Sequence, residues 1–244
     1  MKKIISLLVF SLGFTFIAIA QDSIRVPVTD FDPELMGDDV FKDSRWSELK
    51  LPKRDKTNYS LIEDEERVYI KAESNNSASG LVYKIDIDPK EFPILEWSWK
   101  VNNVLENGDI TKKSGDDYPA RIYITFDYNK KNLRLKDRIV YFTIITFTKF
   151  DIPLRGINYV WANKAEVGTI VPSSFTDWVY MVAVQSGEEQ AGTWQIQTQN
   201  IYEDYKRAFG EEPPRINGIA IMTDSDNTKE FSEGYYGDII FKRK

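Results

Sequence analysis

Six consecutive side chains that offer an oxygen form the segment "TDSDNT", and they directly follow the apolar run "IAIM". In extended chain, alternate side chains point the same way, which would bring Asp224, Asp226 and Thr228 toward one point. Carboxylate and hydroxyl oxygens are the ligands that hard cations prefer. We therefore expect a structural calcium ion here, with Asp238 of the later segment "YYGDIIF" as a further candidate ligand.

Other interpretations of "TDSDNT" stay open. Asp and Asn side chains often cap backbone N–H groups in a turn, and carboxylates at a strand end can also bind a ligand or take part in catalysis. The segment is not an EF-hand, because that loop needs Gly at its sixth position and Glu at its twelfth. Counted from Asp224, those positions hold Lys229 and Tyr235.

A second polar group lies in "GDDYPARIYITFDY". Asp116 and Asp117 precede an alternating strand whose polar face would carry Arg121, Tyr123 and Asp127. An arginine beside carboxylates forms a charge-assisted pair or holds an acidic or hydroxylated ligand. Planar donors, a ring and acceptors together suit a sugar, so we expect a glycan or another small polyhydroxylated molecule to bind at these five residues. A plain solvated sheet face is the alternative.

The tryptophans divide into two groups. Trp97 and Trp99 share an alternating face with Leu95, which predicts that they are core residues. Trp161 in "NYVWAN" and Trp194 in "AGTWQ" lie beside turns, where a ring can be exposed. We include Trp161 among the candidate ligand-binding residues, as a ring on which a sugar could stack.

The sequence has no His and no Cys, which restricts the possible chemistry. It excludes Ser-His-Asp and Cys-His nucleophiles and histidine metal centres. The leading hypothesis is a non-catalytic binding domain. The first alternative is a glycoside hydrolase or lyase in which Asp116 or Asp117 pairs with Asp224 or Asp226. The second alternative is a structural or assembly protein of the cell envelope.

The chain opens with two lysines, an apolar run and Ala18-Ile19-Ala20, an order typical of a secretory signal. We expect cleavage after Ala20, export by the Sec route to the periplasm or the outside, and no membrane insertion afterwards; an uncleaved anchor is the alternative. Residues 1–20 hold two of the 32 Lys and Arg and no acid, so 30 basic and 38 acidic residues remain, a formal charge of −8. That charge disfavours nucleic acid as a partner.

Period-two alternation predicts strands with one wet face at 80–88, 94–101 and 120–128. Runs that are apolar on both faces, at 178–184 and 219–222, predict central strands. Short strands separated by turn-rich pieces favour a sandwich. The predicted fold is therefore mainly β, an antiparallel β-sandwich with one or two short helices, in a single domain over 21–244.

Two segments depart from the strand pattern. "NIYEDYKRAFG" has Ile201, Tyr205 and Ala208 near helical spacing and Gly210 as a stop, which predicts a helix. Residues 133–150 are ambiguous, because a helical face overlaps a run rich in β-branched and aromatic residues. The pattern slightly favours a helix there.

Several motifs, taken in order, resemble those of an exported bacterial family of unknown function, domain-of-unknown-function family 3047, across about Leu61 to Phe241. They are "SASGLVYKIDID", "LEWSWKV", "GDDYPARIYITF", "NYVWAN", "YEDYKRAFGEEPPRINGIAIMTDSDNT" and "YYGDIIF". The resemblance implies no established activity. The opening "VTDFDPEL" and the closing "YYGDIIF" also resemble the first and last strands of galactose-binding-like jelly-roll modules. That second resemblance implies a jelly-roll sandwich in which acidic residues near both ends of the chain hold a structural calcium.

Overall fold

The structure is a computed structural model that describes residues 22–31, 46–64, 66–133, 135, 137–139, 141 and 154–244. Its strands are β1 Ser23–Val26, β2 Ser47–Lys50, β3 Asn58–Glu63, β4 Val68–Asn75, β5 Ala78–Ile87, β6 Ile94–Val101, β7 Arg121–Phe126, β8 Gly156–Ala162, β9 Ile170–Pro172, β10 Val179–Ser186, β11 Gln195–Asn200, β12 Ile216–Asp224 and β13 Phe231–Lys242. The helices are α2 Ile201–Phe209 and the 3₁₀ turns η1 Val28–Asp30, η2 Lys113–Gly115 and η3 Lys130–Asn132.

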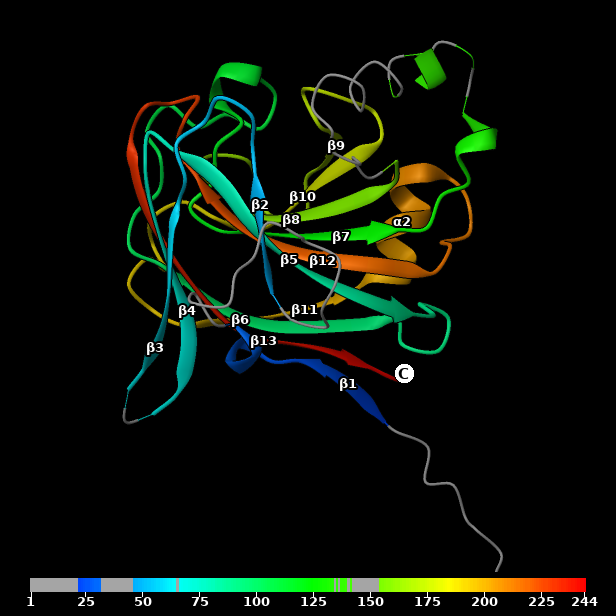
Figure 1. The fold of residues 1–244 in the computed structure, drawn as a ribbon, viewed down its shortest axis with the longest axis horizontal. Helices are drawn as coiled ribbons and strands as arrows, with labels where there is room; N and C mark the ends of the chain where they lie inside the picture. Colours follow the sequence, from blue (N-terminus) through cyan, green and yellow to red (C-terminus); the bar gives the residue numbers. More distant parts are fainter. Residues whose placement is uncertain are drawn as a thin grey trace, which may run out of the picture.

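The strands form two sheets that face each other (Figure 1). The first, sheet A, has the order β11-β6-β13-β4-β3, with β1 paired to the end of β13. The second, sheet B, has the order β2-β5-β12-β7-β8-β10-β9. Among the described strands, all pairs are antiparallel except β8 with β10, which are parallel. The predicted jelly-roll β-sandwich is therefore confirmed, with one parallel pair that alternation did not reveal.

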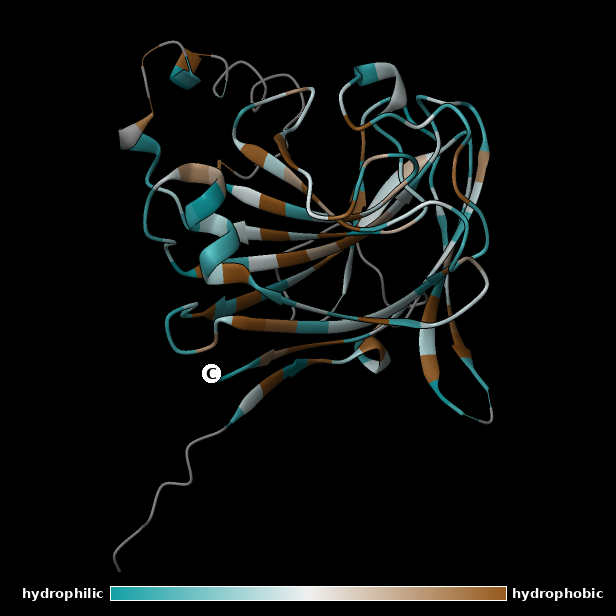
Figure 2. Cartoon of the chain, turned by 180° about the vertical axis from the view of Figure 1, so that it is seen from behind, coloured by the Kyte–Doolittle hydropathy of each residue, from teal (hydrophilic) through white to brown (hydrophobic). Residues whose placement is uncertain are grey.

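The core lies between the sheets and follows the alternation along the strands. In β6 every second residue is buried, so the prediction that Trp97 and Trp99 are core residues is confirmed. Their rings meet edge to face, with centroids 5.3 Å apart, and Tyr159 of β8 packs on Trp97 from the opposite sheet. Figure 2 shows the resulting alternation of hydrophobic and hydrophilic segments along the strands.

The predicted helix is α2, which packs beside one end of sheet B (Figure 1). The Asn200 side chain accepts from the N–H of Glu203 at its start, and Gly210 ends it with a positive φ of 70°. Tyr205 packs against Phe126 of β7, with ring centroids 4.6 Å apart. This short helix therefore covers one edge of the core.

Much of the ambiguous segment 133–150 lies outside the described residues. Its described positions 135, 137–139 and 141 are helical. Among the described residues, no helix combines the length and the apolar character needed to cross a bilayer.

Candidate functional site

Two loops at one end of the sandwich carry four of the polar residues singled out in the sequence, Asp116, Asp117, Asp226 and Thr228. The first, residues 102–120, joins β6 to β7 and contains Asp116 and Asp117. The second, residues 225–230, joins β12 to β13 and begins directly after Asp224. Because β7 and β12 are antiparallel neighbours in sheet B, the start of β7 lies beside the end of β12, and the two loops meet there.

Asp117, Asp224 and Asp226, the acidic cluster, each place a carboxylate oxygen within 4.8 Å of the others. All three side chains are buried. This spacing matches a group of oxygens around one hard cation, which takes its ligands at 2.3–2.6 Å. The fold therefore brings together, from the loop before β7 and from the end of β12 and the loop after it, three carboxylates spaced to hold a metal ion.

Hydrogen bonds hold the carboxylates of Asp117 and Asp224, and an ion pair with Arg54 at 2.9 Å holds that of Asp226. Asp117 accepts from the Asn227 side chain at 2.9 Å and from the backbone N–H of Thr228 at 2.6 Å. Asp224 accepts from the Tyr118 N–H at 3.1 Å. A carboxylate has about four lone-pair positions, so oxygens bonded in this way can still bind a cation.

Arg121 is the buried partner of the acidic cluster. Its guanidinium pairs with Asp224, and its Nη1 lies 4.0 Å from Asp116. The guanidinium carbon also lies 5.2 Å from the ring centre of Tyr118 and 5.4 Å from that of Tyr123. The Nε and Nη1 atoms of Arg121 have no hydrogen-bond partner among the described residues. Arg121 is therefore held mainly by its ion pair with Asp224 and by contacts with two aromatic rings.

Negative charge exceeds positive charge at this site. The described residues that pair with the acidic cluster and Asp116 supply two guanidinium groups, Arg121 and Arg54, against four carboxylates. Burial raises the pKa of Asp224 well above its usual value, and Arg121 only partly opposes this effect. Burial likewise raises the pKa values of Asp116 and Asp226. The site therefore either takes up protons or binds a cation, since unpaired buried charges are costly.

The Asp226→Asn variant should reveal this excess charge through its pH dependence. Because the folded pKa of Asp226 is raised, its contribution to stability is present below pH 3.8 and is lost as pH rises through the folded pKa. In EDTA, the melting temperature of the variant minus that of the wild type should therefore rise between pH 4 and pH 7. Differential scanning calorimetry measures both melting temperatures. A difference that stays flat or falls between pH 4 and pH 7 would contradict the excess of negative charge.

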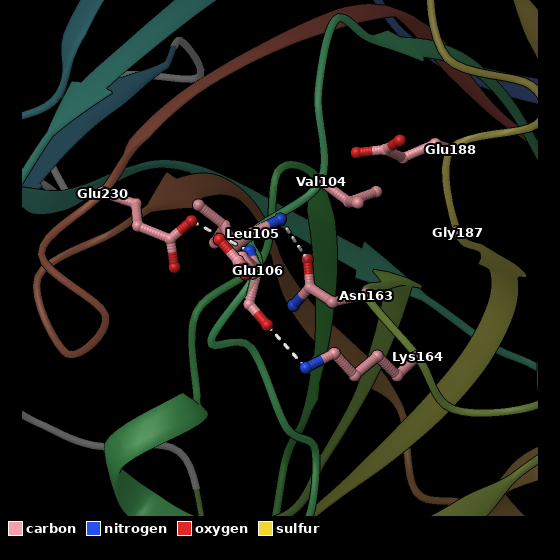
Figure 3. A pocket seen from close by; sticks show the side chains of 8 residues that line it. All are labelled: Val104, Leu105, Glu106, Asn163, Lys164, Gly187, Glu188 and Glu230. Carbon is pink, nitrogen blue, oxygen red and sulfur yellow. Dashed lines mark hydrogen bonds between the residues drawn. The ribbon is translucent and has the colours of Figure 1, made fainter.

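An open pocket of about 620 Å³ lies beside the acidic cluster, and we name it the loop pocket. Figure 3 shows Glu230 and Glu188 on opposite sides of it, and the side chain of Lys164 pointing toward Glu106. Glu106 and Glu188 are exposed, and the Lys164 ammonium donates to the backbone carbonyl of Glu106 at 2.5 Å. The lining residues are Val104, Leu105, Glu106, Asn163, Lys164, Gly187, Glu188 and Glu230.

The two loops that contain Asp117 and Asp226 also supply four of the eight residues that line the loop pocket. At the pocket end, Glu230 accepts from the N–H groups of Glu106 and Asn107, at 2.8 and 2.9 Å. Asn163 links the acidic cluster to the loop pocket. Its amide donates to the Asp117 carbonyl and accepts from the N–H of the pocket residue Leu105, both at 2.8 Å. A cation at the acidic cluster would therefore fix the backbone that shapes the pocket.

The prediction of a wet, ligand-facing strand is wrong for Arg121, which is 3 % exposed. Its face of sheet B is covered by a second hydrophobic cluster that includes Tyr118 and Ile110 from the loop before β7. Tyr123 is partly buried beside Arg121. Asp127 is exposed beyond the far end of β7, six residues from Arg121, so it does not join the site.

The prediction that Trp161 is an exposed platform is also wrong. Its side chain is fully buried, its ring lies 6.0 Å from that of Trp99, and its indole N–H donates to the Gly187 carbonyl. All residues of β8 are buried, because sheet B is covered on both faces at this strand. Trp161 is therefore a core residue.

The structure separates two of the expected metal ligands from Asp224 and Asp226. The backbone N–H of Thr228 donates to the Asp117 carboxylate, while its hydroxyl donates to the Ser225 carbonyl at 3.4 Å. Asp238 instead accepts from the Val28 N–H at 2.8 Å and pairs with Arg25. A register shift between Tyr236 and Ile239 places Asp238 on the other face from Tyr236, contrary to simple alternation.

Sequence reasoning missed several residues of the site. The leading hypothesis grouped Asp117 with the ligand-binding face, and only the enzyme alternative paired Asp116 or Asp117 with Asp224 or Asp226, whereas the structure places Asp117 in the acidic cluster. Arg54, Asn163 and Glu230 had not been singled out. Glu230 lies only four residues after Asp226, and Asn163 ends the quoted motif "NYVWAN", so local signals for both were present. Nothing in the sequence near Arg54 indicated its pairing with Asp226.

A family model described as "Protein of unknown function (DUF3047)" matches residues 44–240. The chain belongs to this family. No curated protein matches this DUF3047 chain. The carbohydrate recognition domain of Emp47p is similar in structure at 13% identity, with 81% of this chain and 95% of that chain covered and a TM-score of 0.36. The family 11 xylanase from Neocallimastix patriciarum is similar at 10% identity, with 91% and 93% covered and a TM-score of 0.33.

Proposed function

We propose that this DUF3047 protein is an exported, non-catalytic domain that binds a carbohydrate or another polyhydroxylated ligand in the loop pocket. We further propose that a calcium ion held by Asp117, Asp224 and Asp226 fixes the loops around that pocket. The observation that carries the proposal is that the two loops that contain Asp117 and Asp226 also supply half of the residues that line the pocket, Val104, Leu105, Glu106 and Glu230.

The chemistry of the pocket supports a hydroxylated ligand. The carboxylates of Glu106 and Glu188 are exposed acceptors, and Lys164 is a donor at the same opening. Carboxylates accept strong hydrogen bonds from hydroxyl groups. A mixed set of acceptors and donors around an open pocket is the arrangement that orients a sugar through several of its hydroxyls.

Burial argues against the two-carboxylate enzyme. A general acid or a nucleophile must reach the scissile bond, within hydrogen-bond distance of the reacting atoms. Asp117 and Asp224 are 0 % and 1 % exposed, and Asp224 is paired with Arg121. These side chains are better suited to holding an ion than to meeting a polymeric substrate.

The test is a glycan array with the wild-type protein in calcium and in EDTA, compared with two variants. Glu188→Gln removes a pocket carboxylate, whereas the matched control Glu189→Gln changes an exposed neighbour outside the pocket lining. For a glycan bound by the wild type in calcium, we expect about tenfold weaker binding by Glu188→Gln, the effect of one lost charge-assisted hydrogen bond. The control should bind as the wild type does, and EDTA should weaken binding.

Two outcomes would contradict this function. If the protein retains no glycan in calcium, the proposal that it binds a carbohydrate is wrong. Hydrolysis of bound glycans, lost in Asp117→Asn and Asp224→Asn, would instead favour the enzyme.

A further inference from the structure

The outer face of sheet A carries three aromatic side chains in mutual contact, which we name the aromatic triad. Tyr69 comes from β4, Tyr235 from β13, and Trp194 lies directly before β11. The ring centroid of Tyr69 lies 5.4 Å from that of Trp194 and 5.8 Å from that of Tyr235, and the last two are 6.4 Å apart. Tyr69 and Trp194 are partly exposed, so the triad meets solvent.

The strand register places the aromatic triad on the face opposite the core. Tyr235 is paired with Lys100 of β6, while the next residue, Tyr236, is paired with the buried Trp99. Gln195 at the start of β11 is also paired with Trp99, so Trp194 falls beside Lys100. The row from Trp194 through Lys100 to Tyr235 therefore crosses three neighbouring strands on the outer surface.

Two cations lie over the rings of the triad. The guanidinium carbon of Arg67 is 4.7 Å from the ring centre of Trp194. The Lys100 ammonium is 4.1 Å from that of Tyr235 and 5.8 Å from that of Trp194. These positions are within the range of cation–π attraction. Arg67 and Lys100 would repel a cationic ligand and attract an anionic one.

We propose that the aromatic triad, with Arg67 and Lys100, is a second binding surface, for an acidic polysaccharide whose sugar units carry carboxylates. The rings provide an apolar platform for the C–H faces of the sugars. The Arg67 guanidinium can bind a carboxylate through two parallel hydrogen bonds, and the Lys100 ammonium adds a point charge. This surface lies on sheet A and does not depend on the loop pocket or on a cation at the acidic cluster.

The triad also has a structural role that a test must separate from binding. Cross-strand aromatic contacts stabilise sheets whether or not they bind a ligand. Lys71, on the same face, pairs with Glu73 and Glu233, both at 3.0 Å. These ion pairs lie within sheet A, so we assign Lys71 to the stability of the sheet. Arg67 lies 3.7 Å from the carboxylate of Glu66, a side chain that is 80 % exposed, and Lys100 has no carboxylate partner among the described residues. Arg67 and Lys100 are therefore the cations assigned to the ligand.

The experiment is affinity electrophoresis of the protein in gels containing polygalacturonate or neutral dextran, run in EDTA. The protein has a formal charge of −6, so general electrostatics repel the polyanion and any retardation reports a local site. We expect retardation by polygalacturonate but not by dextran, reduced by salt. It should be about tenfold weaker in Trp194→Ala and in Lys100→Gln.

Ile196→Ala is the matched control, because Ile196 is 74 % exposed on the same face of β11 and lies outside the triad. It should be retarded as the wild type is. Thermal unfolding of each variant separates loss of binding from loss of folding, and Lys100→Gln keeps most of the side-chain volume. The proposal is overturned by absent retardation, by equal retardation in dextran, or by equal behaviour of a folded Lys100→Gln variant and the wild type. None of these outcomes bears on the loop pocket.

Discussion

Replacing Arg121 with methionine is expected to destabilise the protein by about 3–5 kcal/mol at pH 7, the cost of breaking a buried ion pair. Methionine has a similar length and no charge, so Asp224 and Asp116 would lose the guanidinium that faces them. For a domain of this size, the melting temperature should fall by roughly 6–20 °C. Thermal or urea unfolding measures the change.

The loss should shrink in acid, because burial raises the pKa of Asp224 and its protonation removes the pair in the wild type as well. Arg54→Met is the control. The Arg54 side chain is 48 % exposed and pairs with Asp226 at 2.9 Å, so its removal should cost less than about 1 kcal/mol. Equal stability of Arg121→Met and the wild type at pH 7 would mean that the buried pair does not hold the site.

Gly234→Ala should be nearly as damaging, at about 3 kcal/mol. Gly234 is a central residue of β13, paired with both β4 and β6. A Cβ there would overlap the Pro119 carbonyl oxygen and lie 2.7 Å from the Thr223 hydroxyl. The first obstacle is backbone, which cannot rotate away, so the cost falls at the upper end of that for overpacking. Unfolding in urea measures the loss.

The variant should also weaken calcium binding, because Pro119 follows Tyr118, whose N–H donates to Asp224. The control is Gly156→Ala in β8. A Cβ at Gly156 would make only ordinary contacts, the nearest at 3.5 Å, so stability should change by less than about 1 kcal/mol. A Gly234→Ala variant as stable as Gly156→Ala would show that β13 is not in close contact with the loop before β7 at Pro119.

Local patterns predicted the strands and the helix well, because their physical cause is local. Alternation in β6 reports directly which side chains face the opposite sheet, and Trp97 and Trp99 followed it. The cap at Asn200 and the stop at Gly210 likewise act within one turn of α2. The family was also recognisable from motifs spread along the chain.

The same alternation misjudged the polar face of β7. Period two separates two faces of a strand but does not say what covers each of them. Loop residues such as Tyr118 cover this face, so Arg121 became a buried ion-pair partner instead of a surface donor. The register shift in β13 changed the face of Asp238 in a similar way, since one inserted residue reverses the alternation.

The acidic cluster was only half predictable. Asp224 and Asp226 are close in sequence, so their proximity is local. Asp117 lies over a hundred residues earlier and reaches them only because β7 and β12 pair in sheet B. A single sequence contains no signal for that pairing, and the loop pocket depends on the same long-range contacts.

The most direct test of the calcium site is the melting temperature of the protein in EDTA and then in increasing calcium, with Asp226→Asn in parallel. An ion that binds only the folded state stabilises it, by about 2.7 kcal/mol at a hundred times the dissociation constant. The melting temperature of the wild type should therefore rise by roughly 5–10 °C, and Asp226→Asn should lose most of this rise. No rise in the wild type, or the same rise in Asp226→Asn, would contradict a calcium ion at Asp117, Asp224 and Asp226.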